Sequence, residues 1–160
     1  MSIKTMTKAD FKLFWPTFSR IVSDQETYAY DPNINFEDGY KLWCAPPKRA
    51  FIYERDGVVC GSYYITPNAK GPGAHICNCG YMVAPSCRGR GIAQSLYEHS
   101  LSIAKEHGFK AMIFNNVVAT NVVAVYLWKK MGFQTIGTIP KAYLHKSLGY
   151  VDCYIMHKEL

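Results

Sequence analysis

Arg88-Gly89-Arg90-Gly91-Ile92-Ala93 is the stretch that decides the fold, because it joins an apolar strand to an amphipathic helix. The strand is expected over residues 75–83, and apolar residues recur at helical spacing over residues 92–103. Glycines in such a turn let the backbone approach a ligand closely, and the positive end of the helix favours a phosphate. The stretch therefore predicts a phosphate site, although a basic, glycine-rich turn that only connects two elements has the same composition.

Two common phosphate-binding motifs are excluded. The P-loop string Gly-x-x-x-x-Gly-Lys-Ser/Thr does not occur in the sequence. A dinucleotide fingerprint needs a third glycine, where this chain has Gln94. It also needs an acidic residue about 20 positions further on to hold a ribose, where this chain has Lys110.

Two motifs resemble those of the GNAT superfamily of N-acetyltransferases. They are Val83-x-Pro85 with Arg88-x-x-Gly91-x-Ala93, and Asn121-x-x-Ala124-x-x-Leu127-Trp128-x-x-x-Gly132-Phe133. The resemblance implies acetyl-CoA as the co-substrate and no metal. The implied coenzyme A residues are Tyr81, Met82, Val83, Arg88, Gly89, Arg90, Gly91, Ile92, Ala93, Gln94, Asn121 and Trp128. Asn121 is equally well explained as a helix N-cap.

Composition narrows the class of protein. The chain has 160 residues, of which 49% are hydrophobic and 14% aromatic, so we expect one folded domain over residues 1–160. The formal net charge of +6 comes from scattered basic residues, which a local phosphate site explains better than a nucleic-acid surface. Neither a long apolar run nor a signal peptide is recognisable, so we expect a soluble, cytoplasmic protein without membrane contact.

The six cysteines suggest neither a zinc ribbon nor a redox motif, because none forms a Cys-x-x-Cys pair. His75, Cys77 and Cys79 alternate and therefore share one face of a strand. A metal site there is chemically feasible, but buried strand cysteines that behave as small hydrophobic residues are far more common. We expect no metal.

The order of predicted elements is strand, two helices, three strands, helix, strand, helix and two strands, which is an α/β layout and also the GNAT order. The expected strands cover residues 3–6, 50–54, 58–66, 75–83, 110–115, 133–139 and 150–158; the helices cover 36–44, 91–107 and 120–131, and a first one runs from a cap at Thr7 or Asp10 to Val22. A loop with Pro140, Tyr143 and His145 should separate the last two strands. We therefore expect a single-domain GNAT-like fold, with a central mixed sheet of about seven strands flanked by about four helices.

Two departures from the common GNAT pattern concern catalysis. Many relatives carry a tyrosine that protonates the departing thiolate, but here Trp128 occupies that position and Tyr126 faces another side of the helix. Many relatives also place a glutamate on a central strand, yet residues 74–83 and 110–116 contain no Asp or Glu, and Asn116 stands near that position. Asp152 is expected to make a structural hydrogen bond.

These departures imply direct attack on the thioester by an amine that is already neutral. Water accepts the proton, and a thiol with a pKa of about 8.5 leaves readily. The backbone N–H of Val83 is expected to stabilise the oxyanion. Asn116 is the other candidate for the catalytic position.

Four further strings resemble a narrower GNAT branch, which includes the fungal acetyltransferases of azetidine-2-carboxylate and other proline analogues and their bacterial relatives. The strings are Asn78-x-x-Tyr81-Met82-Val83, Phe114-Asn115-x-Val117-Val118-x-Thr120-Asn121, Leu127-Trp128 and Gly149-Tyr150-Val151-Asp152. The resemblance implies that Asn78 and Asn115 bind the carboxylate of the substrate. The alternative is that both amides satisfy backbone groups where two strands separate.

We therefore expect an acetyl-CoA-dependent N-acetyltransferase acting on a small-molecule amine, such as an amino acid or a toxic analogue of one. Acetylation of a protein or peptide, and a non-catalytic acyl-CoA-binding module, remain the alternatives. A homodimer is a further expectation, because dimers are frequent in this superfamily. Candidates for the substrate wall are Tyr28, Tyr30, Phe36, Tyr143 and His145.

Overall fold

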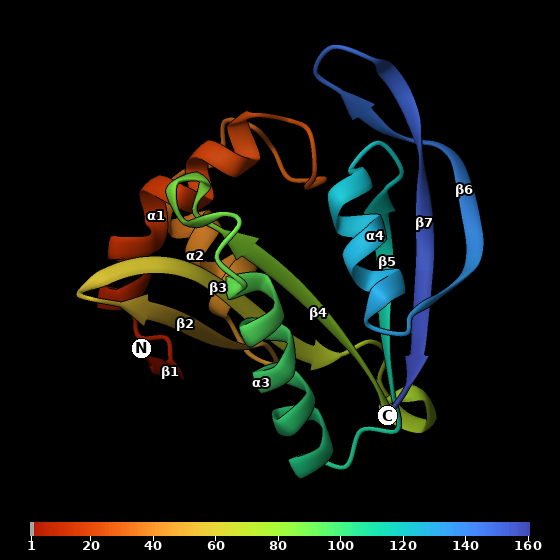
Figure 1. The fold of residues 1–160 in the computed structure, drawn as a ribbon, viewed down its shortest axis with the longest axis horizontal. Coiled ribbons are helices and arrows are strands. Elements are labelled where there is room, and N and C mark those ends of the chain that lie inside the picture. The colour runs from red at the N-terminus through yellow and green to blue at the C-terminus, as the bar shows by residue number, and fades with distance from the viewer. Residues whose placement is uncertain (1) are drawn as a thin grey trace.

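The computed structural model describes residues 2–160 and contains a seven-stranded sheet with helices packed against it (Figure 1). The strands are β1 (Ser2–Thr5), β2 (Arg49–Arg55), β3 (Val58–Pro67), β4 (Ile76–Val83), β5 (Ala111–Val118), β6 (Gln134–His145) and β7 (Gly149–Glu159). The helices are α1 (Lys8–Ser23), α2 (Phe36–Cys44), α3 (Ile92–Glu106) and α4 (Val122–Lys130), with short 3-10 turns η1 (Gly71–Gly73) and η2 (Pro85–Cys87). The expected α/β fold, with a mixed sheet of about seven strands and about four helices, is confirmed.

The strands follow the order β1-β2-β3-β4-β5-β7-β6, and β4–β5 is the single parallel pair of the sheet over residues 2–160. This pair is short, because Ile76–Asn78 align with Ala111–Ile113 and no register continues beyond them. Figure 1 shows the two strands separating towards their C-terminal ends. The sheet is therefore continuous at one end of β4 and open at the other.

The two faces of the sheet are covered by different helices. Along β2, Ala50 and Ile52 pack into the cluster formed with α1 and α2, while Phe51 and Tyr53 pack into the cluster formed with α3 and α4. Alternation along a strand sends successive side chains to opposite faces. None of the helices within residues 2–160 is long and apolar enough to cross a membrane.

The start of α1 follows from its first residues. Thr7 is the N-cap: its hydroxyl oxygen accepts the N–H of Asp10, and the Asp10 carboxylate accepts the N–H of Thr7. This reciprocal capping box satisfies two N–H groups that the helix itself leaves unpaired. Both expected cap residues therefore contribute to the cap.

The expected loop between the last two strands is wrong, because Pro140, Tyr143 and His145 lie inside β6. The register against β7 shifts between Ile139 and Tyr143, and Lys141 adopts a φ of 51°. The Lys141 N–H donates to the Asp152 carboxylate at 2.9 Å, which confirms a structural hydrogen bond for that residue. A proline is tolerated in an edge strand at such an irregularity, and the composition of the segment suggested a loop for the same reason.

Gly80 brings β4 unusually close to an aromatic side chain of β3. A Cβ at Gly80 would lie 2.5 Å from Cε1 of Tyr64. The Tyr64 ring cannot move away easily, because Trp43 packs against it edge to face with centroids 4.9 Å apart, and Lys48 Nζ lies 4.7 Å from its centroid. The position of Tyr64 therefore depends on the missing side chain at Gly80.

We predict that Gly80→Ala lowers the free energy of unfolding by about 1–3 kcal/mol, because overpacking at this contact displaces the Tyr64 ring. Denaturant unfolding of the purified variant measures the change. Gly137→Ala is the matched control, since a Cβ there meets Ile155 at ordinary contact distances of 3.5 Å and more. Equal stability of the two variants would contradict the prediction.

Candidate active site

The open end of β4 presents main-chain groups to the gap beside β5. The N–H of Ala84 donates to the carbonyl oxygen of Cys60 on β3, and peptide groups alternate in direction along a strand. The peptide groups of Tyr81 and Val83 therefore face away from β3, into the gap. Met82 turns its peptide group towards β3 and its side chain into the α1–α2 cluster. Neither group faces the gap, although the sequence predicted a contact between Met82 and the coenzyme.

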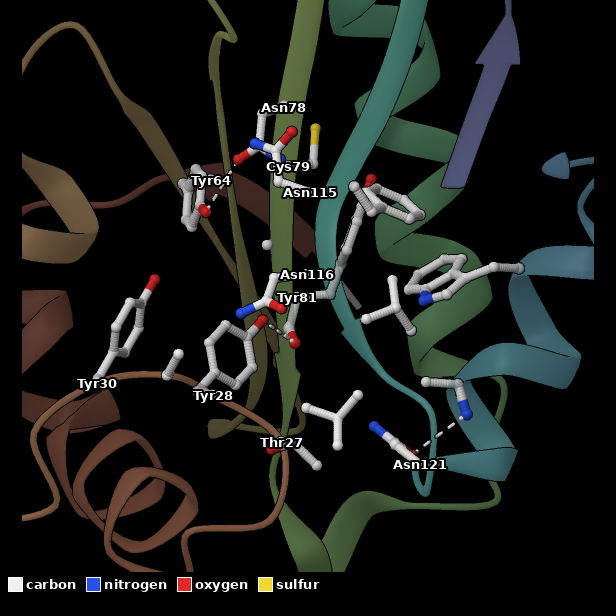
Figure 2. A pocket seen from close by; sticks show the side chains of 17 residues that line it. Thr27, Tyr28, Tyr30, Tyr64, Asn78, Cys79, Tyr81, Asn115, Asn116 and Asn121 are labelled. Carbon is white, nitrogen blue, oxygen red and sulfur yellow. Dashed lines mark hydrogen bonds between the residues drawn. The ribbon is translucent and has the colours of Figure 1, made fainter. Parts of the chain in front are cut away.

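A cavity of about 250 Å³ occupies this gap (Figure 2). Its lining residues are Thr27, Tyr28, Ala29, Tyr30, Tyr64, Asn78, Cys79, Gly80, Tyr81, Phe114, Asn115, Asn116, Val117, Val118, Asn121, Ala124 and Trp128. Tyr28 and Tyr30 belong to the loop between α1 and α2, whereas Ala124 and Trp128 belong to α4. Both sides of the sheet thus contribute to one cavity.

Asn78 lies where the β4–β5 ladder ends. Its Nδ2 donates to the carbonyl oxygen of Ile113 at 2.9 Å, and its Oδ1 accepts the hydroxyl of Tyr64 at 3.1 Å. One of its amide hydrogens satisfies a backbone carbonyl, as the structural alternative predicts. A primary amide carries two hydrogens, so one remains for a ligand.

Asn115 and Asn116 occupy an irregularity in β5. The register against β7 shifts between Phe114 and Val117, and such bulges redirect side chains next to active sites. Asn115 Nδ2 donates to Oδ1 of Asn68 at 2.7 Å. Asn116 is exposed, Figure 2 shows its amide in the middle of the cavity, and no hydrogen bond joins this amide to another residue of the described chain.

Tyr28 spans the cavity and is hydrogen-bonded on both sides of it. Its hydroxyl donates to the carbonyl oxygen of Tyr81 on β4 at 2.7 Å, and its own carbonyl oxygen accepts the hydroxyl of Tyr143 on β6 at 3.2 Å. The neighbouring Gln25 side chain donates to the carbonyl oxygen of Leu144 at 3.1 Å. The α1–α2 loop is thereby tied to both sides of the gap, and Tyr28 limits the width of what can enter.

The expected substrate wall is only partly formed by the residues predicted for it. Tyr28 and Tyr30 line the cavity, and Tyr143 supports Tyr28 from behind. Phe36 instead packs against Phe11 and Trp15 in the α1–α2 cluster. His145, also outside the cavity lining, accepts the N–H of Ser147.

The cavity is electrically neutral: none of the lining residues carries a carboxylate, an ammonium, a guanidinium or an imidazole. Burial raises the pKa of the Tyr28, Tyr30 and Tyr64 phenols above their ordinary value of 10.0. These hydroxyls therefore stay protonated at neutral pH, where they donate hydrogen bonds and cannot act as bases.

The turn between β4 and α3 has the geometry of an anion site. Gly89 and Gly91 both have φ of 74°, and a Cβ on either would meet no atom of the described chain within 4 Å. The first bond inside α3 runs from the Ser95 N–H to the Gly91 carbonyl, so the N–H groups of residues 92–94 have no partner within the helix. The exposed Arg88 adds positive charge, and these features suit a pyrophosphate.

Helix α4 places two of the predicted residues at the cavity. Asn121 is the N-cap, since its Oδ1 accepts the N–H of Ala124 at 3.3 Å, and its amide hydrogens are left for other partners. Trp128 is buried against Tyr81 and Phe114. Tyr126 is 71% exposed and points away, so α4 brings no phenol to the gap.

Two partners of the predicted asparagines were missed. Tyr64 on β3 bonds to Asn78 on the next strand, and Asn68, directly after β3, bonds to Asn115 on β5. Tyr64 lies in an apolar strand like any core residue, and Asn68 follows Pro67 in what the sequence presents as an ordinary turn. The sequence around each residue does not indicate its role, because that role is a hydrogen bond to a neighbouring strand.

Comparison with known proteins identifies related chains. The sequence profile of the Acetyltransferase (GNAT) family matches residues 11–133. N-acetyltransferase aca1 from Schizosaccharomyces pombe is 44% identical over 96 residues, a match that covers 59% of this chain and 46% of that protein. The chain therefore spans about half the length of this curated relative.

Solved structures show the same arrangement. A GCN5-related N-acetyltransferase from Kribbella flavida is 42% identical, with a TM-score of 0.93 over 99% of this chain and 97% of that chain. The structure of yncA from Salmonella typhimurium, solved with its cofactor acetyl-CoA, has a TM-score of 0.84 over 100% of this chain and 94% of that chain. At 18% identity, the likeness to yncA shows the fold alone.

Proposed function

Because the chain belongs to the acetyltransferase (GNAT) family, we propose that it transfers an acetyl group to the amine of a small molecule held between β4 and β5. The observation that carries this proposal is the open edge of β4, where the peptide groups of Tyr81 and Val83 face away from β3 and Tyr81 lines a cavity bordered from both faces of the sheet. An open strand edge binds an extended molecule through main-chain hydrogen bonds. A donor from one face and an acceptor from the other can meet there.

Acetyl-CoA supplies the activated acetyl thioester when it is bound. The turn and the first N–H groups of α3 would hold its pyrophosphate, and the edge of β4 would pair with its pantetheine arm. The free amide hydrogens of Asn121 support a role beside this arm. The residues proposed for coenzyme A are Tyr81, Val83, Arg88, Gly89, Arg90, Gly91, Ile92, Ala93, Gln94, Asn121 and Trp128.

The neutral cavity supports direct attack by an uncharged amine. The Val83 N–H donates to the thioester oxygen as negative charge develops on it. Asn116, with its free amide in the cavity, accepts a hydrogen bond from the amine and orients it. Without a carboxylate or imidazole in the lining, the released proton goes to water.

The acceptor carries a carboxylate in this proposal, as an amino acid or a toxic amino-acid analogue does. Asn78 and Asn115 lie on the α1–α2 side of the gap, and each keeps one amide hydrogen after its structural bond. Amide donors bind a carboxylate without adding charge beside the reacting amine. Tyr28 spans the cavity and limits its width, which favours such a small molecule over a peptide chain.

Two observations favour a second candidate, a non-catalytic acyl-CoA-binding module. Trp128 occupies the position where many relatives carry a tyrosine acid, and the cavity offers no base. Both candidates bind coenzyme A, so binding alone does not separate them. Release of free thiol in the presence of an amine distinguishes the enzyme from the binding module.

We predict that thiol release from acetyl-CoA, measured over amino acids, imino acids, polyamines and peptides, is fastest with small carboxylate-bearing amines. For these, kcat/KM rises tenfold per pH unit up to the pKa of the acceptor amine, because only the neutral amine attacks and the buried tyrosines stay protonated. Acceptors with different amine pKa values should shift the profile accordingly. A common inflection near neutral pH for every acceptor would instead reveal a base on the enzyme, and binding of coenzyme A without thiol release from any amine would establish the non-catalytic module.

Asn115→Ala should raise KM for an amino acid about tenfold or more, because it removes a hydrogen bond to a charged group worth about 1.5–3 kcal/mol. The same amino acid as its carboxamide serves as the control substrate and should keep its KM. Asn115 is the better choice than Asn78, whose loss would also leave the Ile113 carbonyl unpaired. An unchanged KM for the amino acid would remove the carboxylate role.

A further inference from the structure

Two cysteine side chains meet beneath the turn between β4 and α3, and the proposed chemistry uses neither. Cys60 belongs to β3 and Cys87 ends η2, directly before Arg88. Their sulfur atoms lie 2.8 Å apart, and the two residues are 2% and 3% exposed. Two thiols from separate elements are thus already in contact.

The pair is linked mechanically to the turn. The Ala84 N–H donates to the Cys60 carbonyl oxygen, and the Cys87 N–H donates to the Ala84 carbonyl oxygen, both at 2.8 Å. Ile92, the first residue of α3, is buried in the same hydrophobic cluster as Cys60 and Cys87. A change at the two sulfurs therefore reaches both the beginning of the turn and the first residue of the helix.

The resting state of the pair is a dithiol. Burial and the neighbouring Cys87 raise the pKa of the Cys60 thiol to about 11, against the opposing effect of Arg90 and Arg55. Ser86 and Arg88, on either side of Cys87, are exposed, so the pair lies directly below the protein surface. The thiolate is the form that reacts with an oxidant, so the raised pKa keeps the pair reduced except under strongly oxidising conditions.

We propose that Cys60 and Cys87 form a reversible disulfide under oxidising conditions, and that this modification weakens the binding of coenzyme A. Hydrogen peroxide accepts two electrons and two protons from the two thiols. One sulfur–sulfur bond forms, and the peroxide is reduced to two molecules of water. A dithiol reductant reverses the step by exchange and is itself oxidised to a disulfide. The sulfur separation falls from 2.8 Å to about 2.05 Å, which draws Cys87 and the turn attached to it towards β3.

The first test is chemical and needs no ligand. Full-length protein is treated with hydrogen peroxide, its remaining thiols are alkylated under denaturing conditions, and its peptides are mapped by mass spectrometry without reduction. We expect a Cys60–Cys87 linked peptide, lighter than its reduced parts by two hydrogen atoms, that disappears after dithiothreitol. Oxidation of other cysteines without this linked peptide would overturn the modification.

The second test measures coenzyme A binding by calorimetry before and after oxidation, and this part rests on the proposed function. We expect the dissociation constant to rise about tenfold and to recover with dithiothreitol. Cys87→Ala should abolish both the cross-link and the change, whereas the control Cys44→Ala should keep both. A cross-link with unchanged affinity would overturn the coupling, and a reduced protein that fails to bind coenzyme A would count against the proposed function while the peptide map still decides the disulfide.

Discussion

The amide of Asn78 donates to the Ile113 carbonyl oxygen where the parallel ladder of β4 and β5 ends, and the site depends on this break. Up to that point the peptide groups of the two strands form hydrogen bonds with each other. Beyond it, the peptide groups of Tyr81 and Val83 face a gap rather than a strand, and an unpaired strand edge is costly unless another molecule or side chain covers it. The Tyr28 hydroxyl covers one such carbonyl, and the cavity occupies the rest of the gap.

The end of the β4–β5 pairing also determines which chemical groups line the gap. The gap is lined from both faces of the sheet, so the α1–α2 loop, the asparagines of β4 and β5 and helix α4 border one space. That space is lined by amides, phenols and the Cys79 thiol, and burial raises the pKa of this thiol well above its ordinary value. Such a lining favours a neutral nucleophile and relies on position rather than on proton transfer by a side chain. The lining has no carboxylate or imidazole, and burial raises the pKa of the phenols still further above neutral pH, so the cavity offers no base.

Much of the fold was predictable because its signals are local. The cap at Thr7 and Asp10, the glycines of the Arg88–Gly91 turn and the periodicity of α3 each act within a few residues. Pro140 misled, since its place in β6 depends on pairing with β7 and on Asp152 holding the Lys141 N–H. Several of the predicted residues, such as Asn78, Asn115 and Trp128, line the cavity, but their hydrogen bonds were not predictable. Which atom of Asn78 or Asn115 is already occupied depends on Tyr64 and Asn68, and residue type does not carry that information.

The central claim is that the open edge of β4 receives the pantetheine arm of coenzyme A. Amide hydrogen exchange followed by NMR, with and without acetyl-CoA and with no acceptor amine present, tests this residue by residue. We predict that the ligand slows exchange at Tyr81 and Val83, whose N–H groups face the gap, and leaves Met82, already paired with β3, unchanged. Equal protection of all three amides, or protection of none while acetyl-CoA is bound, would contradict the account.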